Sequence, residues 1–336
     1  MYGLWLGRKK HRSSILIKKY NYMNILMVGH SGAGKTSFMA GLYRYLGEST
    51  DGYGISAKKE NQKRQLSRMA DALSKGRYPA GTDVQSQYEF SFTVHGEDLV
   101  PFNWIDYRGG ILLSDSPDES DMDKFMNSIQ KADALVVFLD GEKLSQPGSC
   151  WNMEYDILIS CIENSLSVSH NSWFPISFVI TKCDLVSDGT SFYGLHRFEN
   201  LFSQISQSKT VGSMLIQCSI TSDVYFSPFL VLAYSVYGGS PIYINRTINA
   251  INSAQRRAEA HRPSSILGTI LGVGEQILSG VAEIFDAGWQ TEYEKTWAAD
   301  ADVEKLQAKL NELQSRADEL KGKLEKWQED NLIQCM

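Results

Sequence analysis

The feature of this sequence that most constrains its fold is the glycine-rich segment 29–36, which reads Gly-His-Ser-Gly-Ala-Gly-Lys-Thr. It follows an apolar run, residues 25–28, and precedes a run of helix-forming residues, 37–46. Glycines at this spacing let backbone N–H groups curl around phosphate oxygens, so a strand, this loop and a helix together form a phosphate-binding loop. The order of the three segments predicts an α/β fold that holds a nucleotide by its phosphates.

The side chains of this loop have different expected roles. Lys35 is predicted to contact the terminal phosphates, and the Thr36 hydroxyl is predicted to bind Mg²⁺. The helix that begins near Lys35 directs its positive N-terminal dipole at the same anion. The residues expected to contact the nucleotide here are Gly29, His30, Ser31, Gly32, Ala33, Gly34, Lys35, Thr36 and Ser37.

A second candidate contact lies at the end of a later strand, residues 101–106. Asp106 ends this run, and Gly109 follows it in the sequence Asp-Tyr-Arg-Gly. The aspartate can hold Mg²⁺ through water, and the Gly109 backbone N–H can meet the terminal phosphate and so sense its presence.

A third motif points to the base of the nucleotide. The continuous apolar run 134–139 is typical of a strand buried on both faces of a parallel sheet, and the next such run, 176–180, leads into Thr-Lys-Cys-Asp at residues 181–184. Asp184 can accept two hydrogen bonds from guanine, while the Lys182 stem can lie over the purine ring. Charge-assisted bonds contribute about 1.5–3 kcal/mol each. Adenine lacks both donors, so the motif favours GTP over ATP.

A further strand, 214–216, runs into a serine-rich turn that suits a loop capping the guanine O6 atom. Ser219 is the member of this turn best placed for that role. The residues expected around the base are Thr181, Lys182, Asp184, Ser219 and Ile220.

Together these motifs, in this order and each at a strand end, resemble the G domain of the TRAFAC class of P-loop GTPases, with Ras-like topology, over residues 23–240. The resemblance implies a mostly parallel sheet with one antiparallel edge strand, helices on both faces, and the ligands GTP or GDP and Mg²⁺. It also implies a switch I threonine that binds Mg²⁺ and the terminal phosphate. Thr82 is the matching position, because it stands just before the alternating strand 88–94 and a predicted turn over 95–98. Thr93 lies inside that strand and fits less well.

The resemblance thus implies that Thr36, Thr82 and Asp106 form the metal site. One departure concerns catalysis: Ras-like enzymes carry a water-positioning glutamine where this chain has Gly110. Slow intrinsic hydrolysis follows, unless Arg108, His30 or a partner residue supplies the missing stabilisation. The catalytic candidates are Lys35, Thr82 and Arg108.

The segment between the first helix and Thr82 is longer than in minimal Ras-like domains. Residues 58–75 show helical spacing of apolar residues, which indicates either an additional helix on the domain edge or a lid beside switch I. This segment, the Tyr-Pro-x-Gly-Thr turn and the sequence Asp-Tyr-Arg-Gly-Gly are similar to bacterial GTPases of signalling and conflict (defence) systems.

Composition restricts the cellular setting. The formal net charge of -6 argues against general nucleic-acid binding, and five cysteines without paired spacing favour a reducing, cytoplasmic setting. No uncharged apolar run is long enough for a membrane-spanning helix. Residues 1–22 are locally basic, and form either a disordered or loosely docked leader or an arm for a membrane or nucleic acid.

Beyond the expected G domain, residues 241–336 are predicted to form a helical extension. Residues 264–285 suit a helix buried against the G domain or another subunit, or an interfacial membrane helix. Residues 296–328 carry apolar residues at heptad spacing, which predicts a coiled coil with helices of this chain or of another chain.

Two functional hypotheses follow. The first is a GTP-dependent switch with slow hydrolysis that signals through residues 264–328 to a protein partner. The second is a scaffold or assembly subunit that binds GTP or GDP structurally and turns over little. An ATP-dependent enzyme is opposed by the motif at 181–184.

Overall fold

The computed structural model describes one folded body and a few isolated positions. The described residues are 22–47, 52–79, 86–107, 119–147, 152–166, 173–187, 191–220 and 228–239, with 242–243, 246, 249, 311, 315 and 334–335.

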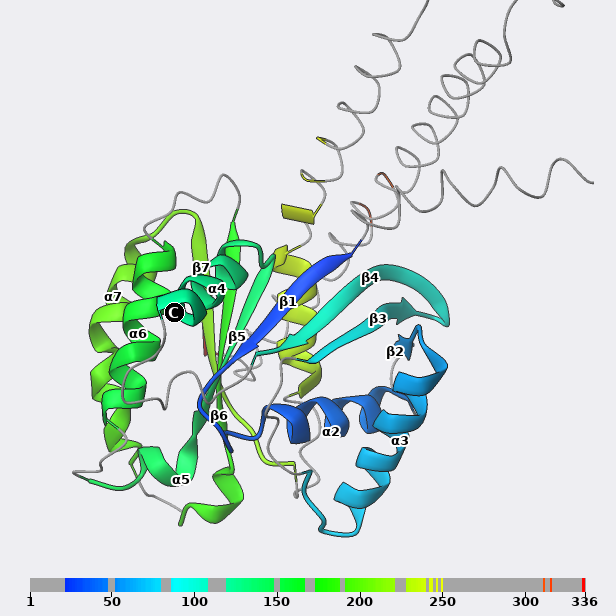
Figure 1. Ribbon diagram of the computed structural model, residues 1–336, viewed down its shortest axis with the longest axis horizontal. Helices are drawn as coiled ribbons and strands as arrows, with labels where there is room; N and C mark the ends of the chain where they lie inside the picture. Colours follow the sequence, from blue (N-terminus) through cyan, green and yellow to red (C-terminus); the bar gives the residue numbers. More distant parts are fainter. Residues whose placement is uncertain are drawn as a thin grey trace, which may run out of the picture. The chain divides into compact units, whose positions relative to one another are not determined.

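The body is built on one sheet with the strand order β2-β3-β4-β1-β5-β6-β7-β8 (Figure 1). The strands are β1 (Met23–Val28), β2 (Tyr53–Ala57), β3 (Ser86–Val94), β4 (Glu97–Asp106), β5 (Ala134–Asp140), β6 (Phe174–Thr181), β7 (Val211–Gln217) and β8 (Gln334–Cys335). Neighbouring strands from β4 to β7 are parallel, whereas β3 is antiparallel to β2 and β4, and β8 is antiparallel to β7. The expected mostly parallel sheet is confirmed, and it has two antiparallel strands: β8 at one edge, and β3, which is second from the other edge. Strands β2 and β8 had not been predicted.

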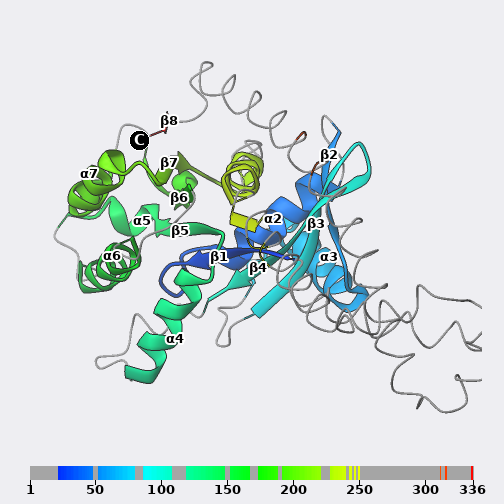
Figure 2. The ribbon, with the colours of Figure 1, turned by 90° about the horizontal axis from the view of Figure 1, so that it is seen from above.

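Helices cover both faces of this sheet, as expected. They are α2 (Lys35–Gly47), α3 (Glu60–Ser74), α4 (Glu119–Gln130), α5 (Gly141–Leu144), α6 (Asn152–Leu166) and α7 (Glu199–Gln207), with two 3-10 turns, η2 (Cys183–Leu185) and η3 (Tyr193–Phe198), and a further helix over residues 228–239. Figure 2 shows α4, α6 and α7 on one side of the sheet and α2 and α3 on the other. No described helix combines the length and the apolar character needed to cross a bilayer.

The core follows from the apolar strands. Every residue of β5 and β6 is buried, which confirms the interpretation of their continuous apolar runs. Side chains on one face of these strands, such as Leu135, Val137 and Phe178, pack with α4, α6 and α7 in one cluster. Burial on both faces holds the strand ends rigidly, and the functional motifs lie at those ends.

The hairpin between β3 and β4 is tighter than predicted. Its turn is His95–Gly96, with φ of 50° and 81°, and not the whole segment 95–98. Two consecutive residues with positive φ form the turn whose twist matches that of paired antiparallel strands, so β4 already begins at Glu97.

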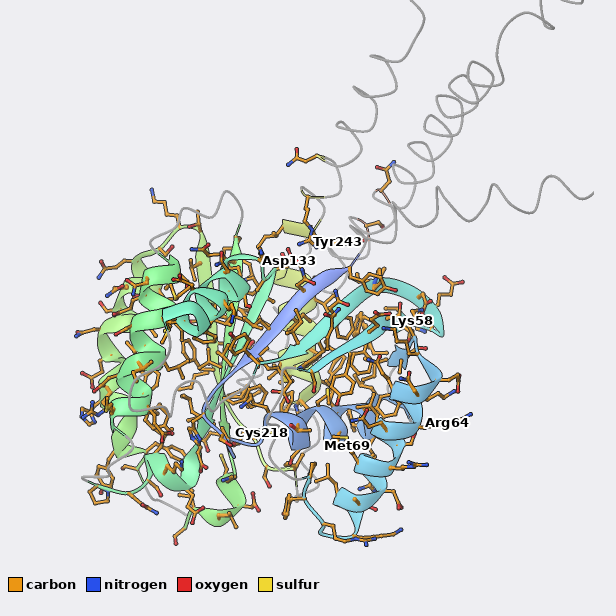
Figure 3. The ribbon with its side chains drawn as sticks, viewed as in Figure 1. Lys58, Arg64, Met69, Asp133, Cys218 and Tyr243 are labelled. Carbon is orange, nitrogen blue, oxygen red and sulfur yellow. The ribbon has the colours of Figure 1, made fainter. Side chains whose placement is uncertain are left out.

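The predicted helix within 58–75 is present as α3, with Leu66 and Ala70 buried. Gln62 connects it to β3, because its side chain accepts from the Glu89 N–H at 3.0 Å and donates to the Gln87 carbonyl at 2.7 Å. Figure 3 labels Arg64 and Met69 on α3. These contacts support the reading of α3 as an additional helix on the domain edge.

The helix 228–239 includes Gly238 and Gly239, although consecutive glycines are typical of a helix end. A Cβ atom on Gly239 would lie 2.3 Å from the Met23 Cε atom and 2.8 Å from the Asp133 carbonyl oxygen. The glycines therefore allow the helix to pack closely on the start of β1.

Several predictions fall outside the described residues. They concern residues 1–21, the helix 264–285 and almost all of the heptad segment, of which only Asn311 and Ser315 are described, as helical and exposed. The division into a leader, a G domain and an extension stays a prediction.

Candidate functional site

The phosphate-binding loop has the backbone conformation that its glycines predict. Gly29 and Gly34 adopt φ of 145° and 85°, which residues with a Cβ atom rarely reach. A Cβ atom on Gly29 would also stand 2.6 Å from the Phe138 carbonyl oxygen. The loop is therefore pressed against the end of β5, and only glycine fits at Gly29.

Lys35, the first residue of α2, reaches back over this loop. Its Nζ atom donates to the carbonyl oxygens of Gly29, at 2.9 Å, and His30, at 3.0 Å. Burial lowers the pKa of Lys35, and the nearby Asp106 carboxylate opposes that shift. The ammonium group thus lies between the loop and Asp106, where it can also donate a hydrogen bond to a phosphate group in the loop.

Thr36 and Asp106 meet although they are far apart in sequence. The Thr36 hydroxyl donates to Asp106 Oδ2 at 2.9 Å. Parallel pairing of β1 and β4 sets Asp106 beside Met27, just before the phosphate-binding loop. Two of the three predicted metal ligands are therefore together, and Asp106 is buried.

The donor set fits Mg²⁺. This ion takes one or two protein oxygens and completes its octahedron with phosphate oxygens and water, so a hydroxyl and a carboxylate at a phosphate-binding loop suffice. The described residues contain no cluster of three His, Cys, Asp or Glu side chains that could hold a metal by themselves. Thr82, the third predicted ligand, lies outside the described residues.

Thr181 connects the base motif to the phosphate-binding loop. Its buried hydroxyl lies 2.9 Å from the Ala33 carbonyl oxygen and 3.2 Å from that of Leu139. One hydroxyl proton is thus directed at two backbone acceptors of the protein. The Thr181 side chain thus connects the phosphate-binding loop to the loop after β6. This role differs from the predicted contact with the base.

Lys182 is held in place by a residue that sequence analysis missed. Its backbone is left-handed, with φ of 56°, and its Nζ atom pairs with Asp140 Oδ2 at 2.6 Å. The other oxygen of the buried Asp140 carboxylate accepts from the N–H groups of Glu142, at 3.1 Å, and Lys143, at 3.3 Å. A lone carboxylate at the end of the apolar β5 run was the signal that could have revealed it.

Asp184 and Ser219, predicted to lie around the base, are in direct contact. The Ser219 hydroxyl donates to Asp184 Oδ1 at 2.8 Å. Two backbone bonds keep their loops together, from Cys183 N–H to the Cys218 carbonyl at 3.4 Å and from Cys218 N–H to the Ile180 carbonyl at 2.7 Å. Figure 3 shows Cys218 at the end of the sheet where α2 begins.

Ile220 contributes differently, because its side chain packs on α2. A Cβ atom on Gly41 would lie 2.6 Å from Ile220 Cγ2. The turn that carries Ser219 is thus fixed to the helix that carries Thr36.

His30 faces the protein interior. Its ring is 1% exposed, packs edge-on against Tyr155 of α6 at 5.8 Å, and places Nδ1 2.7 Å from the Ser31 carbonyl oxygen. Because a carbonyl only accepts, Nδ1 carries the proton. Burial, above all, lowers the pKa of His30 to about 4, so the ring is neutral. This position suits support of the loop and not contact with an attacking water; Arg108, Gly109 and Gly110 lie outside the described residues.

Comparison with known families supports this interpretation. The Double-GTPase 1 family model matches residues 26–175, which include the phosphate-binding loop and Asp106. A comparison with curated proteins found no match.

Several solved structures are similar to the chain. The signal recognition particle receptor complex of Chaetomium thermophilum shares 16% identity, over 60% of this chain and 93% of that one, with a TM-score of 0.38. A variant of Era from Aquifex aeolicus shares 14% identity, over 67% and 68% of the two chains, with a TM-score of 0.33. For a bacterial selenocysteine-specific elongation factor the identity is 15% and the TM-score 0.33, and the match covers 63% of this chain but only 29% of that one.

The family match and the site agree on the class of protein. The match covers the phosphate-binding loop and the strand that ends in Asp106, and the Thr-Lys-Cys-Asp motif at residues 181–184 lies a few residues beyond its end. The ligands of this class are GTP or GDP and Mg²⁺. Residues 26–175 thus match a GTPase family, and the described body has the fold of a P-loop GTPase G domain.

Proposed function

We propose that this protein is a GTP-dependent switch with slow intrinsic hydrolysis, whose nucleotide state is read by a protein partner. The observation that carries the proposal is the 2.9 Å hydrogen bond between Thr36 and Asp106. It links the phosphate-binding helix to the last residue of β4, from which the chain continues to Gly109 and α4. A change at the terminal phosphate therefore has a short route to the segment after β4.

Each residue of the site has a separate task in this proposal. Lys35 neutralises phosphate charge, Thr36 and Asp106 hold Mg²⁺, and Asp184 reads guanine while Ser219 fixes its orientation. Mg²⁺, when bound, supplies charge neutralisation at the terminal phosphates.

Slow GTP hydrolysis is expected because the position after Gly109 lacks a side chain that could orient water. Gly110 has no side chain to orient an attacking water, and His30 is committed to the Ser31 carbonyl. Arg108 is the candidate within the chain for the remaining stabilisation, since an arginine at the developing charge contributes about 10³ to 10⁵ in rate. Single-turnover hydrolysis by wild type and Arg108→Ala tests this: rapid hydrolysis by both would contradict slow turnover and the role of Arg108.

Guanine selection is tested by calorimetry. Two charge-assisted bonds of about 1.5–3 kcal/mol each predict a loss of at least about 100-fold in GTP affinity for Asp184→Ala, with ATP binding weakly to both proteins. Asp184→Asn is the matched variant: its amide can donate to the xanthine carbonyl, so xanthosine triphosphate should gain relative to GTP. Equal binding of GTP and ATP by wild type would refute the assignment.

The scaffold alternative makes a different prediction. Hydrogen exchange is compared with GDP and with a non-hydrolysable GTP analogue bound to the full chain. A switch requires a difference in the segment after β4 and in α4, whereas a structural nucleotide leaves both segments the same. Equal protection in the two states would favour the scaffold.

A further inference from the structure

The outer face of α3 and its two ends carry an excess of positive charge, within a chain whose formal net charge is -6. The cations of this segment are Lys58, Lys59, Lys63, Arg64, Arg68, Lys75 and Arg77, and its carboxylates are Glu60 and Asp71. A local excess of one sign on a protein of the opposite sign is a feature of a surface and not of the overall composition.

Most of this excess is not compensated within the described part of the chain. Some of the lysines have carboxylate partners, in the ion pairs Lys58–Asp98, Lys59–Glu89 and Lys75–Asp71. The remaining cations are exposed and form no ion pair with a described residue: Lys63, Arg64, Arg68 and Arg77. Only the exposed Glu60 is left to offset them, so the surface keeps a net positive charge.

Arg64 and Arg68 form the centre of this surface. They are four residues apart, so their side chains are neighbours on one face of α3. Each stands two residues, or about 200° around the helix, before a buried residue, Leu66 or Ala70. Figure 3 shows Arg64 on the side of α3 that faces away from the sheet. Both guanidinium groups can therefore be reached by a partner.

The contacts that fix α3 do not include the nucleotide site. Gln62 holds its first turn to the β3 backbone through two hydrogen bonds, and Gln65 donates to the Tyr88 hydroxyl at 3.2 Å. Leu66 and Ala70 bury the inner face of the helix. None of these contacts involves the phosphate-binding loop or the base motif, so the surface should keep its shape in both nucleotide states.

The residue types and their pattern select a protein segment as the occupant. Arginine presents a planar fork that binds a carboxylate through two parallel hydrogen bonds. Glu60, one turn before Arg64 on the same face, would repel a continuous polyanion such as a nucleic acid or an anionic membrane. A protein can place carboxylates against Arg64 and Arg68 and a different residue against Glu60. Tyr78, 58% exposed beyond the end of α3, adds an aromatic group of the kind enriched in protein interfaces.

We propose that the outer face of α3 docks an acidic segment of a protein partner, whose glutamate or aspartate side chains pair with Arg64 and Arg68. The docking site is constitutive, since α3 is fixed independently of the nucleotide. It goes beyond the proposed switch, because the partner is held in both nucleotide states.

The probe is a synthetic helical peptide of about sixteen residues, with glutamates at i and i+4 spacing on one face and alanine elsewhere. A peptide with glutamine in place of glutamate is the charge control. Fluorescence anisotropy measures binding to the full chain with GDP and with a non-hydrolysable GTP analogue. We expect the glutamate peptide alone to bind, equally in both states, and more weakly as salt is added.

Two double variants separate this surface from general charge effects. Arg64→Glu with Arg68→Glu should weaken peptide binding about tenfold or more, because two ion pairs are replaced by repulsion. Lys131→Glu with Lys209→Glu is the matched control: it changes the net charge equally at exposed residues that follow α4 and α7, across the sheet from α3 (Figure 2). It should bind the peptide within about twofold of wild type. All four positions are exposed, so both variants should fold and bind GDP as wild type.

Equal peptide binding by the two double variants would overturn the proposal, since the peptide would then be held elsewhere, for example by the basic residues 1–22. Binding in only one nucleotide state would refute a constitutive site. Single-stranded DNA or phosphatidylserine vesicles that bind more tightly than the peptide, and lose binding in the arginine variant, would assign the face to a nucleic acid or a membrane and overturn the proposal as well. GDP binding measured on the same proteins distinguishes each of these outcomes from a failure of the proposed function.

Discussion

Thr181→Val removes a single hydroxyl from the contact between the base motif and the phosphate-binding loop. Valine keeps the volume and branching of threonine, so β6 should retain its packing. The lost hydroxyl donates to the Ala33 and Leu139 carbonyl oxygens at 2.9 Å and 3.2 Å in a buried setting. No comparable donor is offered by the new side chain.

The size of the effect follows from burial. A hydrogen bond contributes about 1 kcal/mol net, and a buried acceptor left without a donor costs about 1–3 kcal/mol. If the loop gives way locally, this cost appears as a drop of about 5- to 150-fold in nucleotide affinity, since 1.4 kcal/mol is a factor of ten. If the loop keeps its shape, the same cost appears in the free energy of unfolding of the nucleotide-free protein.

The assay is an equilibrium titration with a fluorescent GDP analogue, with urea unfolding in parallel. Thr181→Ser is the control, because it keeps the hydroxyl and loses only a methyl group. It should bind within about threefold of wild type. Wild-type affinity and stability in Thr181→Val would refute the role assigned to this hydroxyl.

Three other variants test the site. Asp140→Asn keeps an oxygen that caps α5 but removes the ion pair with the partly exposed Lys182. Calorimetry should show GDP affinity about fivefold lower, with little change in melting temperature. An unchanged affinity would contradict the role of Asp140 in positioning Lys182. The pKa of His30 is about 4 in the folded protein and 6.5 in the unfolded chain, so the unfolded chain binds a proton first as the pH falls. The free energy of unfolding should therefore be unaffected above pH 6.5 and fall by about 2 kcal/mol by pH 5. Urea unfolding should show this loss in wild type and not in His30→Gln. Gly29→Ala places a Cβ atom 2.6 Å from the Phe138 carbonyl oxygen at a φ of 145°, so nucleotide binding should be lost, and calorimetry showing wild-type affinity would disprove that close contact.

The motifs were predictable because their chemistry is local. The glycines at 29, 32 and 34, and the lysine and threonine after them, need only a strand before and a helix behind to form a phosphate site. The continuous apolar runs of β5 and β6 likewise predict, without any tertiary contact, that these strands are buried on both faces. Asp106 was a candidate because it ends a predicted strand, and Asp184 because it lies three residues after one.

Other features depended on contacts that no local pattern encodes. Strand β2 is short, and its role as a sheet edge exists only through pairing with β3. Gly238 and Gly239 look like a helix stop until the approach of β1 and β6 gives them a packing role.

The sequence alone predicted that the chain holds a nucleotide by its phosphates and contacts a guanine base, because spacing along one loop or strand end is enough to define each contact. Only the tertiary structure decided how the contacts are joined: parallel pairing sets Asp106 beside Thr36, Thr181 against Ala33, and Asp140 under Lys182. Burial against α6 likewise decided that His30 supports the loop from within. Such relations arise when strands distant in sequence become neighbours, and they depend on the packing of the whole sheet.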